Sequence, residues 1–502
     1  MLNQAKTLYY RGFIKSCNYA CSYCPFAKKQ PSAKEIARDQ QALEKFSTLV
    51  ARATKVENMN VFFTPYGEAL IYPHIQRSLS QFSKLPQVAY VGIQTNLSCD
   101  IKKLVALWQK EKANLDKIKL WCSFHPDMVD VDAFAQNILD IMQFVEVSVG
   151  AVGNPANLES IQLLRKKLPP SIYLWINKMD GLRRHYTLDE ITEFKAIDPF
   201  FDLELKEPRA TQDCLGGHES FFIEAAGEVY ACNRSKASMG NLYQGNITYT
   251  PCGRKRCDCY LAYSNLTNLP TLQHFGSKKT FRLLEKHKFQ AIFIDVDGTL
   301  TNEKGIITPE VELAVAYLAQ KAKIYLVTAL PYDLTLKKCR KLKPFISGGI
   351  FENGMYICDF ETGQKQQHTF SNECIETLKG IELLENKIMS NSLKSKILVR
   401  LGHKEIPQFM EVVKELDVQV EKEKHCIYMM PKGCNKVEQT IKFCKEKGWP
   451  EEQVLVVGNS ENDRELLRRF PYSVAMPWSE EQVKKQARYC LRVEQIGLIV
   501  EE

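Results

Sequence analysis

Three cysteines near the start of the chain have the spacing of a metal-cluster loop. Cys17, Cys21 and Cys24 form a CxxxCxxC array that directly follows the apolar and aromatic run 8–14. Thiolates are soft ligands that suit iron, and three of them on a cube of four irons leave one iron free to bind another molecule. A zinc site usually closes its tetrahedron with a fourth protein ligand, so zinc is less favoured, and a disulfide is less favoured still. The array therefore predicts an iron–sulfur cluster with one open position.

The same array, with Tyr23 directly before its last cysteine, resembles the signature of the radical S-adenosylmethionine superfamily. The resemblance implies that Cys17, Cys21 and Cys24 hold a 4Fe-4S cluster, that its open iron chelates S-adenosyl-L-methionine, and that Tyr23 packs near the adenine. It also implies reductive cleavage to a 5′-deoxyadenosyl radical, with a reductase, flavodoxin or ferredoxin as electron donor. The CPFAK run that begins at Cys24 is similar to a poorly characterised bacterial group of such enzymes, which brings no substrate with it.

Short strand-like runs alternate with charged, helix-length segments through residues 1–205. Such alternation predicts an α/β fold with parallel strands and crossover helices, in which the loops after the carboxyl ends of the strands carry the chemistry. Six such units resemble the partial (βα)6 TIM-type barrel of the radical enzymes. The runs are 8–14, 61–64, 88–94, 118–123, 145–149 and 172–176.

Three of the predicted loops carry further candidate residues. Gly67 and Glu68 follow the second run and resemble the Gly-Gly-Glu element that receives the ammonium group of the cosubstrate, with Tyr66 standing where a glycine is common. Polar residues at 94–96 and 123–125 close the third and fourth runs. These either face the same rim or cap their own loops, and both interpretations stay open.

A second group of cysteines follows within residues 206–264. A strand, a turn at Gly227 and a second strand would bring distant thiolates together. This arrangement resembles the small cysteine-rich extensions of the SPASM and twitch types, which implies one auxiliary iron–sulfur cluster on four of five cysteines. Which four is open, and a zinc knot is the main alternative. The five are Cys214, Cys232, Cys252, Cys257 and Cys259.

A new pattern begins at residue 289, after an expected linker at 265–288. Asp295 and Asp297 follow a strand-like apolar run and belong to the sequence DxDGTLT. Two carboxylates two residues apart can serve one phosphate only if their loop curls to aim them. The sequence resembles the first motif of haloacid dehalogenase (HAD) superfamily phosphatases, which implies a Rossmann-like domain at 289–502 with Asp295 as nucleophile and Asp297 as general acid and base.

The later motifs of that family appear in order. Thr328 fits the second-motif hydroxyl that binds the phosphoryl group, and Lys436 fits the third-motif lysine that offsets charge. The resemblance implies Mg²⁺ on Asp295, Asp297 and the fourth-motif residues Asn459 and Asp463. Asn459 stands where the family usually has aspartate, and magnesium prefers anionic oxygen ligands. The alternative to a phosphatase is therefore a module that binds a phosphorylated ligand without turning it over.

About a hundred residues separate the second and third motifs, too many for a loop in a compact fold. Their strand-like and amphipathic segments predict an α/β cap at about 333–430, which resembles the cap of the HAD IIB group. A cap that closes over the core excludes water and macromolecules. Small phosphate esters are therefore the expected substrates of this half.

The composition fits a soluble protein with two or three cores. The 502 residues carry a net charge of +8 and include 17 cysteines, and no apolar leader or membrane-length stretch is seen. We therefore expect a cytoplasmic protein that does not enter a membrane. Because the basic residues are spread along the chain, we do not expect nucleic acid as a partner, although a radical RNA-modifying enzyme stays the alternative.

These patterns together predict a bifunctional enzyme. The first half would start radical chemistry on a small-molecule or peptide substrate, and the second half would hydrolyse a small phosphate ester with Mg²⁺. Their presence in one chain suggests that the two halves act in one pathway. The substrate of the radical half, the ester and the oligomeric state are not given by the sequence.

Overall fold

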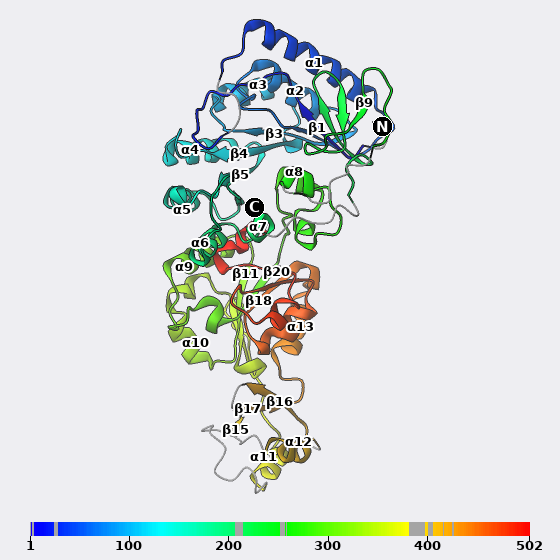
Figure 1. Ribbon diagram of the computed structural model, residues 1–502. Helices are drawn as coiled ribbons and strands as arrows, with labels where there is room; N and C mark the ends of the chain where they lie inside the picture. Colours follow the sequence, from blue (N-terminus) through cyan, green and yellow to red (C-terminus); the bar gives the residue numbers. More distant parts are fainter. Residues whose placement is uncertain are drawn as a thin grey trace. The chain divides into compact units, whose positions relative to one another are not determined.

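The computed structural model divides the chain into two compact units, a first unit Met1–Glu285 and a second unit Lys286–Glu502. The structure describes residues 2, 5–24, 29–205, 214–250, 257, 259–380, 397–399, 405–414, 416–423 and 426–501. Figure 1 labels the elements of both units.

The first unit is built on six parallel strands that lie in sequence order. The strands are β1 (Thr7–Arg11), β2 (Met59–Phe63), β3 (Val88–Thr95), β4 (Ile118–Phe124), β5 (Glu146–Val152) and β6 (Leu174–Asn177). Their side chains are mostly buried, as is expected for strands covered on both faces. All six carboxyl ends therefore meet at one edge of the sheet.

Helices lie between and after these strands and bury an apolar side against the sheet. Figure 1 shows α1, α2 and α3 on one side of it. They are α1 (Ala33–Arg52), α2 (Pro73–Ser83), α3 (Ile101–Lys110), α4 (Val131–Ile141), α5 (Leu158–Lys167), α6 (Leu188–Ile197) and the short α7 (Asp202–Leu205). Polar residues cap the N-termini of three of these helices. Ser32 and Glu35 form a capping box at α1, and the side chains of Asp100 and Asp130 accept hydrogen bonds from the first turns of α3 and α4.

The strands do not close into a ring among the described residues. The sheet runs β6-β5-β4-β3-β2-β1-β7-β8-β9, so the free edge of β1 pairs with β7 (Ser220–Glu224) instead of with β6. The antiparallel strands β8 (Glu228–Tyr230) and β9 (Ser238–Asn241) complete it. The fold is therefore an open α/β sheet, and barrel closure is not seen.

The segment expected to be a linker, 265–288, packs within the first unit up to Glu285. It follows α8 (Tyr260–Tyr263) and contains the 3₁₀ segment η4 (Pro270–Phe281). Its main chain accepts hydrogen bonds from Asn60 and Ser148, and Lys278 pairs with Glu146. These contacts hold η4 against β2 and β5.

The second unit contains an eight-stranded sheet of order β14-β13-β12-β11-β10-β18-β19-β20, in which β13 runs antiparallel to its two neighbours and the other strands are parallel to one another. Its central strand β10 (Ala291–Ile294) lies between β11 (Lys323–Val327) and β18 (Val454–Gly458). The outer strands are β12 (Gly348–Phe351), β13 (Tyr356–Asp359), β14 (Lys365–Gln367), β19 (Tyr472–Ala475) and β20 (Tyr489–Cys490).

Helices flank this sheet, and a separate small sheet has its own core. The flanking helices are α9 (Pro309–Ala319), α10 (Tyr332–Lys338), α13 (Lys436–Lys447), α14 (Arg464–Arg469) and α15 (Glu481–Lys484). The small sheet has the order β15 (Ile397–Val399), β17 (Cys426–Pro431), β16 (Val418–Glu423), and α11 (Asn372–Lys379) and α12 (Ile406–Val413) pack on it. Within the expected cap range 333–430, residues 348–367 belong to the main sheet.

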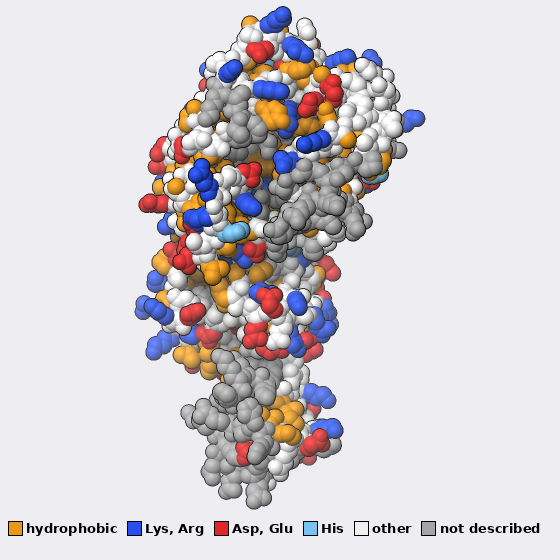
Figure 2. Space-filling model, in the orientation of Figure 1, with side chains coloured by type: hydrophobic (Ala, Val, Ile, Leu, Met, Phe, Trp, Pro, Cys, Tyr) orange, Lys and Arg blue, Asp and Glu red, His pale blue; other side chains and the backbone are white. Residues whose placement is uncertain are grey.

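Charged side chains of both signs mix on the surface. On the face seen in Figure 2, Lys and Arg side chains are interspersed with Asp and Glu over both units. Among the described residues, no helix has the length and apolar character needed to cross a lipid bilayer.

Candidate active sites

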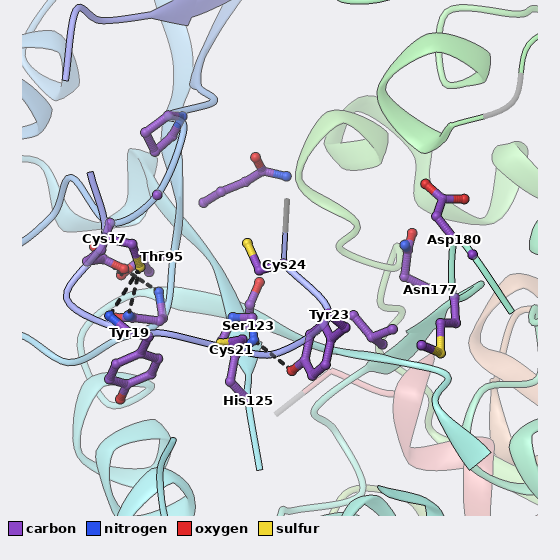
Figure 3. A pocket seen from close by; sticks show the side chains of 18 of the residues that line it. Cys17, Tyr19, Cys21, Tyr23, Cys24, Thr95, Ser123, His125, Asn177 and Asp180 are labelled. Carbon is purple, nitrogen blue, oxygen red and sulfur yellow. Dashed lines mark hydrogen bonds between the residues drawn. The ribbon is translucent and has the colours of Figure 1, made fainter. Parts of the chain in front are cut away.

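A pocket of about 580 Å³ opens at the carboxyl-end edge of the strands in the first unit. The carboxyl ends of the six strands, or the loops after them, contribute to its lining, and Figure 3 shows Asn177 and Asp180 on the side opposite Cys17. Of the predicted site residues, the pocket is lined by Cys17, Cys21, Cys24, Tyr23, Gly67 and Glu68. The structure therefore brings all six residues to one cavity.

The cysteine loop after β1 gathers three thiols at this cavity. Cys17 Sγ accepts a hydrogen bond from the main-chain N–H of Tyr19 at 3.4 Å. Burial, together with the nearby Cys24 and Cys17, raises the pKa of Cys21 to about 11. Three thiolates at this position would therefore repel one another unless a cation joined them, which fits the chemistry of an iron–sulfur cluster.

Among the residues that the structure describes, no group of three or more His, Cys, Asp or Glu side chains lies close enough to hold a single metal ion.

Glu68 is fully buried beneath the pocket and joins two of its loops. Its carboxylate accepts hydrogen bonds from Leu70 N at 2.8 Å, from Thr95 Oγ1 at 3.0 Å and from the main-chain N–H of Asn96. Burial raises its pKa to about 7, against the opposing effect of these donors. The side chain predicted to receive an ammonium group thus also fixes the loop after β2 to the loop after β3.

Gly67 adopts a conformation that other residues rarely reach, with φ of +106°. A Cβ atom at this position would lie 2.1 Å from the carbonyl oxygen of Ser16, immediately before Cys17. Glycine therefore lets the loop after β2 contact the cysteine loop directly.

Tyr23 contacts a histidine from the loop after β4. A hydrogen bond of 3.0 Å joins the Tyr23 hydroxyl to Nδ1 of His125, and the two rings are stacked with centroids 6.1 Å apart (Figure 3). Burial lowers the pKa of His125 to about 4, so that the imidazole is neutral near pH 7. Tyr23 and His125 therefore form an aromatic wall of the pocket.

The second cysteine group contains main-chain and side-chain donors aimed at sulfur. Cys214 Sγ accepts from Gly216 N at 3.3 Å, and Cys232 Sγ accepts from Arg234 N at 3.4 Å. These bonds have the same two-residue offset as the one at Cys17, and N–H donors of this kind stabilise thiolates.

Two more cysteines of this group lie among the described residues. Asn233, next to Cys232, donates to Cys259 Sγ at 3.5 Å, which places Cys259 near Cys232. Cys257 is buried, and Cys252 lies outside the described residues. The donor pattern fits metal-bound thiolates, and it does not distinguish iron from zinc.

In the second unit, one buried lysine joins two buried carboxylates. Lys436 Nζ, at the start of α13, donates to Asp295 Oδ1 at 2.8 Å and to Asp463 Oδ1 at 2.7 Å. Burial and the neighbouring Asp463 raise the pKa of Asp295 to about 7, against the opposing effect of Lys436. Burial alone would lower the pKa of Lys436, but the two carboxylates outweigh burial and raise it. These three residues form the centre of the site.

Asp297 and Thr328 flank this centre. Asp297 lies in the curled segment after β10, and its half-exposed carboxylate is paired with Lys338 of α10. Thr328 follows β11, is 1% exposed, and accepts a hydrogen bond from Leu330 N at 3.1 Å. Because β10 and β11 are adjacent and parallel, their carboxyl ends bring Asp295, Asp297 and Thr328 to one edge, and Lys436 reaches Asp295 there from the start of α13.

The comparisons with known proteins concern this second unit. The family model described as haloacid dehalogenase-like hydrolase matches residues 292–393 and 379–495. The second unit contains a haloacid dehalogenase-like hydrolase domain.

Individual relatives of the hydrolase domain are distant in sequence. A phosphoglycolate phosphatase of Methanosarcina acetivorans is 24% identical over 209 residues, which are 40% of this chain and 89% of the relative. A haloacid dehalogenase-like hydrolase structure from Bacteroides thetaiotaomicron is 20% identical, with a TM-score of 0.36, and the match covers 42% of this chain and 97% of that one. A HAD subclass IIB sugar phosphatase structure is 18% identical, with a TM-score of 0.36, and the match covers 42% and 96% of the two chains.

The expected magnesium site has Asn459 where the family usually has aspartate. The side-chain oxygen of Asn459 accepts a hydrogen bond from Thr299 Oγ1 at 3.0 Å and lies beside Asp295 Oδ2 and the main-chain oxygen of Asp297. Carboxylate, carbonyl and amide oxygens are the kind of ligand that Mg²⁺ takes. These residues would therefore hold Mg²⁺ with one negative charge fewer than an aspartate at position 459 would give.

Three contacting residues were not found from the sequence. Lys338 pairs with Asp297 from a helix about forty positions later in the chain. In the first unit, Asp39 of α1 accepts from the main-chain N–H groups of Phe13 and Ile14, and His74 Nε2 donates to Asp39 at 2.8 Å. Nothing in the local sequence marks these side chains, because each lies in an ordinary amphipathic helix.

Proposed function

We propose that the hydrolase domain is a phosphohydrolase of small phosphate esters. The observation that carries this proposal is the buried Asp295–Lys436–Asp463 network beside Thr328 at the strand ends. A carboxylate held at one oxygen by a lysine keeps its other oxygen for attack on phosphorus, while the ammonium offsets the charge that gathers there.

The proposed reaction has two halves. Asp295 attacks phosphorus and forms an aspartyl phosphate as the ester P–O bond breaks, and Asp297 gives its proton to the departing alcohol oxygen. Asp297 then takes a proton from water, which attacks the phosphorus and releases phosphate, so that the Asp295 carboxylate is restored. The hydroxyl of Thr328 hydrogen-bonds a phosphoryl oxygen. Lys338 holds the Asp297 side chain in place between these steps.

A panel of phosphomonoesters tests the proposal, with phosphoglycolate and sugar phosphates included because the distant relatives carry those names. Full-length protein should release phosphate from at least one ester, and Asp295→Asn should reduce release to background. Asp333→Asn, an exposed carboxylate on α10, is the matched control and should keep full activity. Equal activity of Asp295→Asn and wild type would contradict the proposed nucleophile.

We infer for the first unit that it is a radical S-adenosylmethionine enzyme with a 4Fe-4S cluster on Cys17, Cys21 and Cys24. The supporting observation is the convergence of these three thiols on a cavity at the strand ends, with Tyr23 and His125 as an aromatic wall. The three cysteines fit a cluster because their thiolates would repel one another, and the iron ions of a cluster would offset this negative charge. When bound, such a cluster supplies the electron that cleaves S-adenosylmethionine.

Anaerobic reconstitution with iron and sulfide tests this inference. The protein with S-adenosylmethionine and a reductant should yield 5′-deoxyadenosine, and Cys21→Ser should lose both the product and the associated iron. Cys490→Ser, an exposed cysteine of the second unit, serves as the control. Zinc in place of iron in anaerobically prepared protein would contradict the inference.

The second cysteine group is proposed to hold one auxiliary iron–sulfur cluster. The N–H donors to Cys214 and Cys232 support thiolate ligands there. Iron content should then exceed the four atoms of the first cluster, and zinc in its place would contradict this. The two halves are further proposed to act in one pathway, which predicts that the dephosphorylated product of one half is a substrate or product of the other.

A further inference from the structure

One tryptophan of the chain is exposed, and it belongs to the hydrolase domain. Trp478 is 54% exposed, whereas Trp449 packs against an apolar core. The other three tryptophans are at most 6% exposed: Trp108, Trp121 and Trp175. An indole buries a large apolar area when it gains a partner. The residues beside Trp478 therefore indicate what that partner is.

Trp478 lies at the catalytic edge of the main sheet. It follows β19, in a turn where Ser479 N donates to Met476 O at 3.0 Å. Strand β19 runs parallel to β18, so both strands end at the edge where the site lies. The indole N–H of Trp478 donates to the main-chain oxygen of Gly298 at 2.7 Å, and Gly298 directly follows Asp297. This hydrogen bond fixes the indole beside the residue proposed as general acid.

A second exposed apolar side chain comes from the other side of β10. Helix α10 follows β11, and β11 and β18 lie on opposite sides of β10 in the sheet. Lys338 of α10 pairs with the Asp297 carboxylate. Leu334 precedes Lys338 by four residues, so the two share a face of the helix, and Leu334 is 48% exposed. The segments on both sides of β10 thus each present an exposed apolar side chain near Asp297.

The leaving group of a bound ester must also lie next to Asp297. A general acid has to come within about 2.6–3.2 Å of the oxygen that it protonates. Thr328 and Lys436, which face the phosphoryl group, are buried, whereas the Asp297 side chain is half-exposed. The ester therefore directs its leaving group outward from the buried centre, towards the exposed indole of Trp478.

The indole selects for the shape of the leaving group. A flat ring stacks on an aromatic face with an offset or meets it edge-on, whereas an open chain covers less of that face. Lys338 is already paired with Asp297, so the contact with Trp478 is the stronger basis for selection.

We propose that Trp478 stacks on a flat ring in the leaving group, and that the natural ester of this domain carries such a ring. This assignment rests on the proposed phosphohydrolase function and narrows its substrate class. Trp478 is then a specificity residue that takes no part in the chemistry at phosphorus.

Benzyl phosphate and n-hexyl phosphate are the probes, because both are esters of primary alcohols and only the first carries a ring. Steady-state hydrolysis of both esters with Mg²⁺ is measured for full-length wild type, Trp478→Leu and Trp478→Phe. Leu313→Ala, at an exposed side chain on α9, is the control and should match wild type. Wild type should prefer benzyl phosphate in kcat/KM by about fivefold or more, which is the usual size of an aromatic pair.

The two tryptophan variants separate stacking from a role in holding the loop. Trp478→Leu should lose the preference through a higher KM for benzyl phosphate, with kcat nearly unchanged. Trp478→Phe lacks the N–H that binds Gly298 but keeps a ring, so it should keep most of the preference. If both variants lose activity equally towards both esters, the indole only braces the loop and the proposal is overturned. Equal kcat/KM of wild type for the two esters overturns it as well.

Binding measurements separate this proposal from the phosphohydrolase function. Asp295→Asn cannot form the aspartyl phosphate, so titration calorimetry with this variant measures binding alone. If wild type hydrolyses neither ester, tighter binding of benzyl phosphate than of n-hexyl phosphate, removed by adding Trp478→Leu, supports the ring site without the hydrolase function. Equal or absent binding of the two esters overturns the ring site. Hydrolysis of both esters with equal kcat/KM leaves the phosphohydrolase function intact and removes only the ring site.

Discussion

At the residue scale, the hydrolase site depends on the ammonium group of Lys436, which hydrogen-bonds two buried carboxylates. Lys436 and Asp463 are 2% and 0% exposed, so neither charge is screened by water. Removing one partner from such a buried group leaves an uncompensated charge, which costs more than the pair itself contributes.

Lys436→Met should therefore abolish phosphate release and destabilise the second unit. The expected loss is about 3–5 kcal/mol, because Asp295 and Asp463 would remain buried without their shared cation. Denaturant unfolding of the full-length protein measures it. Lys432→Met, at an exposed lysine in the same segment, should change stability by less than about 0.5 kcal/mol. Equal effects of the two substitutions would contradict the role given to Lys436.

His125 provides a pH test at the same scale. Its pKa is about 4 in the folded protein and about 6.5 when unfolded, so between these values the unfolded chain binds a proton that the folded chain does not. Stability should be fully present above about pH 6.5 and should decrease as the pH falls towards 4, by up to about 3 kcal/mol.

His125→Gln should remove this part of the acid sensitivity. Urea unfolding of the cluster-free first unit at neutral and acidic pH measures it, and His185→Gln, at an exposed histidine, is the control. If wild type and His125→Gln lose the same stability in acid, His125 is not neutral in the folded state.

At the element scale, the positions of the strands could be predicted and the contacts between loops could not. The runs at 61–64, 88–94 and 118–123 coincide with β2, β3 and β4 to within a few residues, because apolar composition and strand length determine where strands form. Parallel pairing then brings the predicted residues to one edge.

Which side chains contact one another depends on how separate helices and strands pack. The hydrophobic periodicity of the sequence predicts the elements but does not predict how they pack. Lys338 beside Asp297 and Asp39 beside Phe13 follow from the positions of α10 and α1 on their sheets. The outer pairing of β1 was also not predicted: the cysteine hairpin was expected as a separate extension, whereas β7 continues the main sheet.

The contact of the loop after β2 with the cysteine loop gives a prediction at this scale. Gly67→Ala would place a methyl group 2.1 Å from the main chain of Ser16, in addition to the cost of its positive φ. Gly181→Ala has a similar φ of +85° and nothing within 4 Å, so it should cost only about 1–2 kcal/mol.

Gly67→Ala should be less stable than Gly181→Ala by at least about 1–3 kcal/mol, which is the usual cost of overpacking. It should also retain less iron after reconstitution. Unfolding curves and iron analysis of both variants measure this. Equal stability and iron content would show that the two loops do not need their close contact.

At the scale of the whole molecule, the two units have separate cores. The first unit has one large cluster of buried apolar residues, and the second has one cluster on its main sheet and another on its small sheet. Since each unit buries its own apolar surface, each should fold as a domain.

Fragments 1–285 and 286–502 should therefore each unfold cooperatively. Calorimetry of the full-length protein should show transitions within a few degrees of those of the fragments. Removal of iron with a chelator should lower only the transition of the first unit. A 286–502 fragment without cooperative unfolding would show that the second unit needs the first in order to fold.

The double pairing of β1 has a consequence for electron transfer. Cys17 follows the carboxyl end of β1, whereas Cys214 precedes the parallel strand β7 and Cys232 follows the antiparallel strand β8, so these two lie towards the opposite end. Five residues of strand span about 16 Å at about 3.3 Å each. If both cysteine groups hold redox centres, β1 and the loop 12–16 before Cys17 form the stretch of chain that separates Cys17 from Cys214 and Cys232.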